Sequence, residues 1–309
     1  MFRLRLGTRG SRLALWQADW VAREMHRLYP TLQIEIKVIK TQGDRILDVA
    51  LSKIGDKGLF TKEIENELLA GEIDLAVHSM KDLPTILPPG LIAGAVLQRE
   101  NPQDVLISSQ GFNLETLPQG GRIGTSSLRR IAQLKALRPD LQPVDLRGNL
   151  ETRLKKMEEQ KLDGIILAYA GVKRLGFDTY ITQMIDTELI LPAVSQGAVL
   201  AEVREGDQDT RKLIAPINDQ AADAATRAER ALLRELEGGC QVPVAALAQV
   251  RGDRLQLRAM VASLDGEHVI RDSHDGEIER AEDIGRNLAM RMLDQGAGQI
   301  LSEIRRLGD

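Results

Sequence analysis

Two stretches of this chain share one pattern, LGTRGSRLALWQA at residues 6–18 and IGTSSLRRIAQLKA at residues 123–136. Each has a short apolar run, a Gly-Thr pair, hydroxyl and basic side chains, and then the apolar spacing of a helix. The repetition predicts two similar α/β units. Each unit would present cations and helix N-terminal N–H groups at the carboxyl end of a strand, where α/β sheets bind anionic ligands.

The neighbouring segments continue this alternation of strands and helices. Strands separated by helices favour a parallel sheet with helices on its faces. The stretch LPAVSQGAVLAEVR at residues 191–204 is interpreted as the crossing that returns the chain to the first unit. Predicted strands lie at residues 3–6, 33–39, 73–77 and 91–97 in the first unit and at 122–124, 143–146 and 163–168 in the second. Predicted helices lie at residues 11–28 and 59–70, from residues 125–130 onward, and from behind Asn149 to about residue 160, while residues 169–175 follow the last strand with Lys173 and Arg174.

From about residue 221 the pattern changes. A helix runs towards Gly238-Gly239-Cys240, and three strand-like stretches follow near residues 245–250, 254–262 and 268–272. Two helices close the chain. This order predicts a smaller α+β domain that carries the thiol.

Composition limits the class of protein. The chain has 309 residues, 43% hydrophobic and 28% charged, as expected for a globular protein of two or three domains. The N-terminus has no apolar core of signal-peptide length, and one cysteine excludes an internal disulfide, so we expect a cytosolic protein. A net charge of −4 and an aromatic content of 3% argue against a nucleic-acid surface. Apolar runs such as residues 91–97 are too short to span a membrane.

Cys240 has an unusual sequence setting. Gly238 and Gly239 leave the thiol unshielded by neighbouring side chains, and Pro243 stops the preceding helix from continuing. A soft nucleophile on a tight turn at a helix end indicates a nucleophile or a point of covalent attachment. The alternative is a small buried apolar residue.

Basic side chains follow the predicted strands of both units. The arginine guanidinium binds a carboxylate at two points, so the set predicts a ligand with several carboxylates. The alternative is that they are solvated surface charges. The set is Arg9, Lys81, Arg129, Arg130, Arg147, Arg153 and Arg174.

Asp82 is the best acid or base candidate, because it follows the strand at residues 73–77 and is surrounded by these cations. It could hold ligand N–H groups or stabilise a developing cation. The alternative is a loop cap or an ion pair with Lys81. His78 could line the same site or serve a structural hydrogen bond.

Other site chemistries lack a motif. The sequence has neither the GxxxxGK[ST] phosphate loop nor the GxGxxG dinucleotide turn. The four histidines have no metal-ligand spacing with Cys240, so we expect no metal.

A series of motifs resembles the porphobilinogen deaminase (hydroxymethylbilane synthase) family. In order they are LGTRGSRLALWQA, TQGD, KGLFTKEIE, AVHSMKDLPT, GRIGTSSLRR, LRGNLETRL, LAYAGVKRLG and LEGGCQVPVA, and they span nearly the whole chain. The resemblance implies two periplasmic-binding-protein-like α/β domains plus a smaller α+β C-terminal domain. Domain 1 would comprise residues 1–97 and 198–216, domain 2 residues 98–197, and domain 3 residues 217–309.

The resemblance also implies a reaction. The chain would be a monomeric transferase that deaminates four porphobilinogen molecules and joins them head to tail. The product, hydroxymethylbilane, would grow on a dipyrromethane cofactor held by a thioether to Cys240, with ammonia released at each step. Each pyrrole carries an acetate and a propionate, which matches the arginine set. Loss of ammonia leaves an electron-poor ring that Asp82 would stabilise.

Individual roles follow from the resemblance, with Asp82 as the catalytic residue. The loop at residues 44–57, with Phe60, would cover the site. The implied cofactor-binding residues are Cys240, Lys81, Asp82, Thr125, Ser126, Ser127, Arg129, Arg130 and Gly171. The implied substrate-binding residues are Arg9, Ser11, Arg147, Arg153, Arg174, Phe60 and Gln196.

One stretch departs from the family pattern. Ser195 stands where glycine is expected, and Leu200-Ala201 stands where Gly-Ile is expected. The departure bears on the geometry of the return crossing and alters none of the residues given a chemical role.

Two other functions compete with this reading. A non-catalytic anion-binding protein of the same two-lobed architecture would use the arginines, but it would need neither Cys240 nor Asp82. A cysteine-dependent hydrolase would need a histidine partner that the sequence near Cys240 does not offer.

Overall fold

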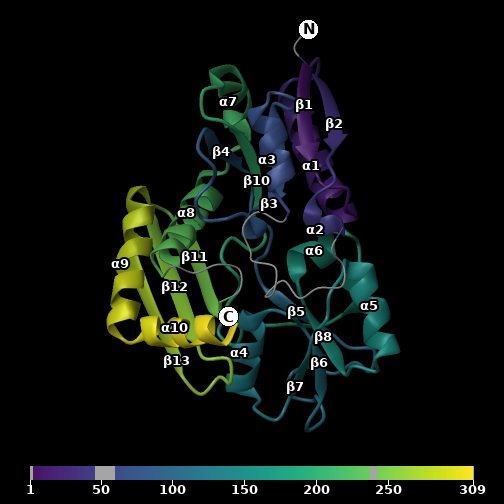
Figure 1. Ribbon diagram of the computed structural model, residues 1–309, viewed down its shortest axis with the longest axis vertical. Helices are drawn as coiled ribbons and strands as arrows, with labels where there is room; N and C mark the ends of the chain where they lie inside the picture. The colour runs from purple at the N-terminus through teal and green to yellow at the C-terminus, as the bar shows by residue number, and fades with distance from the viewer. Residues whose placement is uncertain (1–2, 46–59, 237–241, 309) are drawn as a thin grey trace. The chain divides into compact units, whose positions relative to one another are not determined.

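The computed structural model describes residues 3–45, 60–236 and 242–308 (Figure 1). Cys240 and residues 46–57 of the predicted covering loop lie outside the described residues. The chain divides into two compact units, Met1–Glu100 with Gly197–Asp223 and Asn101–Gln196 with Ala224–Asp309.

The first unit is built on a five-stranded sheet of order β2-β1-β3-β10-β4. β1 runs parallel to β2 and β3, whereas β10 is antiparallel to both β3 and β4. The strands are β1 (Arg3–Thr8), β2 (Gln33–Val38), β3 (Leu75–Ser79), β4 (Leu91–Val96) and β10 (Val199–Arg204). The helices are α1 (Arg12–Leu28), α2 (Gln42–Arg45), α3 (Lys62–Leu69) and α7 (Gln208–Ile214), with 3₁₀ turns η2 (Met80–Asp82) and η4 (Ala215–Ile217).

The second unit contains a sheet of the same size, in the order β7-β6-β8-β5-β9. β6 is parallel to β7 and β8, and β5 is antiparallel to β8 and β9. The strands are β5 (Asp104–Ile107), β6 (Arg122–Gly124), β7 (Gln142–Val144), β8 (Gly164–Ala168) and β9 (Ile181–Met184). The helices are α4 (Leu128–Leu137), α5 (Leu150–Glu159) and α6 (Tyr169–Arg174), with the 3₁₀ turn η3 (Asp178–Tyr180).

The two sheets have one topology, which confirms the prediction of two similar α/β units. β6, β7, β8 and β9 take the places of β1, β2, β3 and β4, and β5 takes the place of β10. The predicted parallel arrangement holds for all strands but one in each sheet, and that one strand is antiparallel to its neighbours. β5 and β10 each follow directly on a segment of the other α/β sheet. A strand becomes parallel to its neighbour when a crossover helix of the same sheet returns the chain to the starting edge. β5 and β10 enter their sheets without such a crossover.

The smaller α+β domain is confirmed as well, in the second compact unit. Three antiparallel strands form the sheet β11-β12-β13. One face packs with the helices around Leu232, Leu257 and Leu288, and the other packs on Ala132 of α4 and Leu191 of the return crossing. The elements are α8 (Gln220–Glu235), β11 (Val244–Arg251), β12 (Arg254–Ala262), β13 (Val269–Glu277), the 3₁₀ turn η5 (Ile278–Arg280), α9 (Ala281–Asp294) and α10 (Ala297–Gly308).

The largest differences from the predicted strands concern β13, β5 and β9. β13 continues past the predicted end at residue 272, because it stays paired with β12 as far as Glu277. β5 and β9 were not predicted, since each is only four residues long and neither shows a clear alternation of apolar and polar residues.

Ser195 lies in the return crossing with a backbone that disfavours any side chain. Its φ is +60°, in the left-handed region, and its side chain is fully buried. The Ser195 N–H donates to Glu229 Oε2 at 2.6 Å, while the Ser195 hydroxyl has no hydrogen-bond partner in the described structure. The glycine expected here would remove both the steric strain and the buried, unpaired hydroxyl.

We therefore expect Ser195→Gly to raise the free energy of unfolding by about 1 kcal/mol, because an L-residue pays roughly that to adopt the left-handed conformation. Urea denaturation measures the change. Ser195→Ala is the control, since it removes the hydroxyl but keeps Cβ. A Gly variant no more stable than the Ala variant would contradict the strain argument.

Candidate active site

A pocket in the first unit brings together four of the predicted site residues. Arg9, Ser11, Phe60 and Asp82 all line it. It lies where β1 and β3 end and α1 and α3 begin, which is the edge predicted for ligand binding. The remaining lining residues are Leu13, Ala14, Gln17, Thr61, Val77, His78 and Ser79.

The turn after β1 sets one wall of this pocket. Ser11 is the N-cap of α1, and its hydroxyl accepts a hydrogen bond from the Ala14 N–H at 3.2 Å, as the sequence predicted. The Arg9 guanidinium lies over the Phe60 ring, 4.2 Å from its centroid. This cation–π contact holds an arginine beside the pocket without neutralising its charge.

The turn after β3 sets the opposite wall. The Met80 N–H donates to the Ala198 carbonyl at 3.1 Å, and the Met80 side chain is buried, so the turn is anchored. Gln17 Nε2 donates to Ser79 Oγ at 2.8 Å. Asp82 is exposed, and its carboxylate has no hydrogen bond or ion pair within the described residues. It is therefore open to a ligand, whereas Lys81 does not line the pocket.

His78, which the sequence placed either in the site or in a structural hydrogen bond, lines the pocket and belongs to a buried group of ionisable side chains. His78 Nε2 and Glu202 Oε2 are 3.1 Å apart, and both side chains are almost completely buried. Glu65 of α3 is also buried, and desolvation raises the pKa of its carboxyl group. Nothing local in the sequence marks Glu202 as the partner of His78, since 124 residues separate them.

In the second unit, Arg129 and Arg130 share one buried carboxylate. Arg129 Nη2 donates to Asp104 Oδ2 at 2.8 Å, and Arg130 Nη2 donates to Asp104 Oδ1 at 2.6 Å. Their Nη1 groups donate to the carbonyls of Leu191 and Ile166. Asp104 itself is completely buried, at the start of the strand β5 that sequence reasoning missed.

This cluster carries a net charge of +1 in the protein interior, from two guanidinium groups and one carboxylate. Burial opposes ionisation of Asp104, but the charges of Arg129 and Arg130 outweigh it and hold the pKa of Asp104 well below its usual range. The Nε atoms of both arginines are buried without a hydrogen-bond partner in the described structure. Orphaned cationic donors in a positively charged cluster fit a ligand carboxylate.

The turn between β6 and α4 holds the predicted hydroxyl residues. Ser126 Oγ donates to the Leu146 carbonyl at 2.9 Å and accepts from the Leu146 N–H at 3.0 Å. The Ser127 N–H donates to Thr125 Oγ1 at 3.3 Å, and Ser127 is the N-cap of α4 without a side-chain cap bond. Thr125 and Ser126 therefore shape the turn, and Ser127 keeps a hydroxyl available at the helix start.

The other predicted site residues of this unit differ in their contacts and burial. Arg147 Nε lies 3.6 Å from Asp145 Oδ2, and Arg153 Nε donates to the Gly148 carbonyl at 2.9 Å. Gly171 and Arg174 belong to α6, and the Arg174 side chain is mostly buried.

Gln196 has a different environment from the one implied for a substrate contact. It is 1% exposed, and its Nε2 donates to Asp104 Oδ1 at 2.9 Å and to the Pro102 carbonyl at 2.7 Å. Its amide supports the buried carboxylate that pairs with the two arginines.

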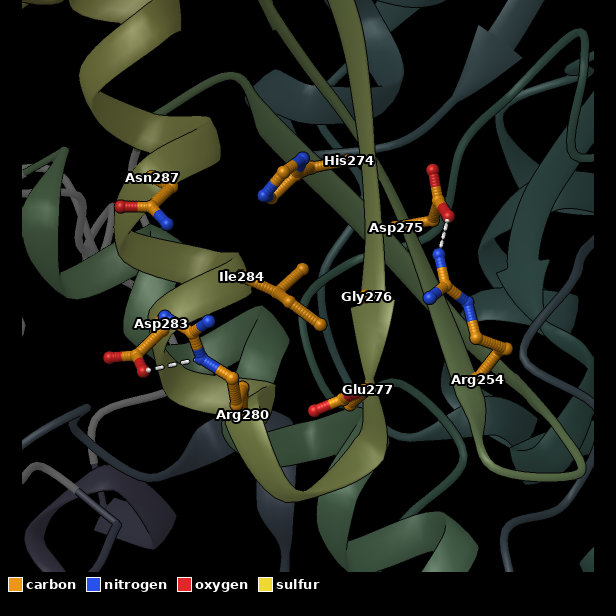
Figure 2. A pocket seen from close by; sticks show the side chains of 9 residues that line it. All are labelled: Arg254, His274, Asp275, Gly276, Glu277, Arg280, Asp283, Ile284 and Asn287. Carbon is orange, nitrogen blue, oxygen red and sulfur yellow. Dashed lines mark hydrogen bonds and ion pairs between the residues drawn. The ribbon is translucent and has the colours of Figure 1, made fainter.

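A second pocket, in the C-terminal domain, is less suited to be the active site. Figure 2 shows that its charges pair with one another, Arg254 with Asp275 and Arg280 with Asp283. No predicted site residue lines it.

The described residues offer neither a metal site nor a membrane-spanning helix. No group of histidine, cysteine and acidic side chains is arranged to hold a metal ion. No helix among them is long and apolar enough to cross a membrane.

Comparison with known proteins gives matches along nearly the whole chain. The family model "Porphobilinogen deaminase, dipyromethane cofactor binding domain" matches residues 4–212, and "Porphobilinogen deaminase, C-terminal domain" matches residues 224–294. A porphobilinogen deaminase of Syntrophomonas wolfei is 60% identical over 306 residues, covering 99% of this chain and 100% of the relative. Another, from Carboxydothermus hydrogenoformans, is 57% identical and covers 97% of both chains.

Among solved structures, similar chains include the substrate-binding domain of a putative molybdenum ABC transporter from Clostridium difficile. It has a TM-score of 0.44 and 10% identity, and the match covers 72% of this chain and 94% of that one.

The buried cluster predicts a large effect of Asp104→Asn. Removing the carboxylate leaves two buried guanidinium charges uncompensated, so we expect a loss of about 3–5 kcal/mol in the free energy of unfolding at pH 7. Because the pKa of Asp104 is lowered in the folded protein, its contribution is present above the unfolded value near 3.9. The difference between the variant and the wild type should shrink only below about pH 4.

Urea denaturation across pH measures this difference. Asp275→Asn is the matched control, since it breaks the exposed ion pair with Arg254 and should cost at most about 1 kcal/mol. Equal losses in the two variants would show that the buried cluster contributes no more to the free energy of unfolding than an exposed ion pair does.

Proposed function

The chain belongs to the porphobilinogen deaminase family, and from this we propose that the pocket around Asp82 is its catalytic site. Its activity is that of the family, a transferase of tetrapyrrole biosynthesis that deaminates and polymerises porphobilinogen on a dipyrromethane cofactor. The observation that supports the proposal most strongly is that the exposed Asp82 carboxylate lines the same pocket as Arg9 and Ser11.

Asp82 has the chemistry that each step of this reaction requires. Departure of ammonia leaves positive charge on a pyrrole ring, and an anion held close to that ring lowers the barrier. The carboxylate can also accept hydrogen bonds from pyrrole N–H groups, which orients the ring. The anchoring of the η2 turn through Met80 supports this role, because it holds Asp82 in place before substrate arrives.

Arg9 and Ser11 provide the complementary contacts for substrate. The Arg9 guanidinium, held over Phe60, can take an acetate or propionate group at two points. Ser11 places a hydroxyl and the first N–H groups of α1 at the same wall, where a helix terminus favours anions.

The dipyrromethane supplies, when bound, the ring carbon on which the product grows. We propose that Arg129 and Arg130 hold its carboxylates, because their unpartnered Nε donors and the net charge of +1 fit an anion. Cys240 is the proposed thioether attachment point. Lys81, Asp82, Thr125, Ser126, Ser127 and Gly171 remain the further proposed cofactor contacts.

The other proposed substrate contacts keep the roles that the resemblance implies, except Gln196. Arg147, Arg153 and Arg174 remain proposed contacts of the growing chain, and Phe60 a covering residue. For Gln196 we propose a positioning role instead, since its buried amide holds Asp104 between the two arginines.

Organisation and cellular setting are also proposals. We propose three domains with the boundaries 1–97 plus 198–216, 98–197 and 217–309. The separate apolar core of the three-stranded sheet supports the third. We further propose a monomer that acts in the cytoplasm without nucleic-acid or membrane partners. The single cysteine and the net charge of −4 support this setting.

Intact mass under denaturing conditions tests the cofactor attachment. The purified chain should exceed its sequence mass by two linked pyrrole units, and Cys240→Ser should show the bare mass. Further increments of one pyrrole unit should appear in the wild type after porphobilinogen is added. A bare mass in both proteins that porphobilinogen leaves unchanged would favour a non-catalytic anion-binding protein.

Asp82→Asn separates catalysis from cofactor assembly. The amide keeps the shape of the side chain but removes the charge, so turnover should fall by at least about 100-fold. The covalent cofactor should remain, as judged by intact mass. Asp253→Asn removes an exposed carboxylate far along the chain and serves as the control. Near-wild-type turnover in Asp82→Asn would disprove the role given to Asp82.

A further inference from the structure

One pocket residue, His78, and its buried partner Glu202 have no part in the functions assigned above. His78 lines the pocket beside Ser79 and Asp82, and its ring is hydrogen-bonded to Glu202. A carboxylate bound to one nitrogen of an imidazole is the arrangement that enzymes use to orient a histidine for proton transfer.

Sheet register explains why this pair forms. β10 runs antiparallel to β3, with Leu200 opposite His78 and Glu202 opposite Ala76. Glu202 and His78 are therefore diagonal neighbours on one face of the sheet. Because Glu202 is completely buried, its charge needs a partner, and the His78 Nε2–H supplies one at 3.1 Å. This leaves Nδ1 as the ring nitrogen with a free lone pair.

Further ionisable groups surround the His78–Glu202 pair. Glu65 of α3 lies in the same buried group, where the charges of Glu202 and His78 both act on it. Oε1 of Glu65 and Oε1 of Glu202 are buried without a hydrogen-bond partner in the described structure. Asp82 and Arg9 are the charged groups on the pocket side.

The reaction of the family creates a need for such a group. Each elongation forms one C–C bond between pyrrole rings, breaks the C–N bond of the aminomethyl group, and breaks one C–H bond at a ring carbon. The proton from that carbon and the departing ammonia add up to one ammonium ion. Because ammonia leaves first, a base is needed afterwards to take the proton from carbon and pass it to the free ammonia or to water.

We propose that His78, oriented by Glu202, is this proton carrier. Its Nδ1 accepts the proton from the ring carbon after the C–C bond has formed, with the electron pair of the C–H bond returning to the ring. It then releases that proton to the ammonia freed earlier in the same cycle, or to water. Glu202 is a positioning residue that fixes the ring. The inference rests on the proposed function, because it places the reacting rings in the pocket around Asp82.

Neither neighbouring carboxyl group suits this task as well. Asp82 is assigned to the ring N–H groups and to the positive charge, and it has to stay ionised for both. Glu65 does not line the pocket, and burial raises the pKa of its carboxyl group, which favours the neutral form. His78 both reaches the pocket and has an ionic partner.

The test uses the cofactor-loaded enzyme and porphobilinogen carrying deuterium on its unsubstituted ring carbon. In His78→Gln, the amide keeps a donor towards Glu202 but cannot carry a proton. We expect kcat to fall by about 100-fold or more with little change in KM. The isotope effect on kcat should exceed that of the wild type, because breaking the C–H bond becomes limiting. Glu202→Gln should show the same two changes to a smaller degree.

Glu65→Gln is the matched control, since it alters the same buried group without touching the pocket, and its isotope effect should equal that of the wild type. A turnover of His78→Gln within about threefold of the wild type would overturn the inference. So would a slower variant with an unchanged isotope effect, which indicates a structural role. Wild-type turnover and its loss in Asp82→Asn report separately on the proposed function.

A second measurement does not depend on turnover. Nitrogen NMR of the ¹⁵N-histidine-labelled full chain reports which ring nitrogen of His78 carries the proton. The neutral ring should be protonated at Nε2, with the lone pair at Nδ1. Protonation at Nδ1 instead would overturn the inference, even if a variant failed to fold.

Discussion

The ionic cluster of Asp104, Arg129 and Arg130 is the constraint on which the second unit depends. A completely buried carboxylate is tolerable only with charged partners, and here two guanidinium groups and the Gln196 amide satisfy it. The cluster ties β5 to the start of α4 and to the end of the return crossing. It also leaves one positive charge in excess, so the interaction that holds the fold creates the anion-binding potential.

The repeated sheet topology explains how one chain offers two sets of ligand contacts. β1 and β6 each end in a Gly-Thr turn before a helix, and β3 and β8 each end in a 3₁₀ turn or a short helix. Arg9 and Asp82 occupy these two places in the first unit, and Arg129 and Gly171 occupy them in the second. Because parallel strands bring these ends to one edge, the fold places contacts from distant segments together.

The two units differ in how they handle charge, which suits different tasks. The first keeps an exposed carboxylate and an aromatic-bound arginine at the pocket, with titratable groups buried behind them. Such an arrangement can respond to charge that develops during a reaction. The second keeps its two arginines buried on a fixed carboxylate, which suits holding an anion that stays in place. The family reaction needs both, since one end of the growing chain reacts while the other is retained.

Local patterns in the sequence determined the elements and the turn residues. The Gly-Thr repeats, the Ser11 cap, β2, β4 and α5 could be read from spacing and capping alone, as could Arg9 and Asp82. Only the tertiary structure decided the antiparallel entry of β5 and β10, the pairing of Asp104 with two arginines, and that of His78 with Glu202. These pairings join residues 25 to 124 positions apart. Short-range periodicity carries no information about such partners, because they are set by which strands become neighbours in the folded sheet.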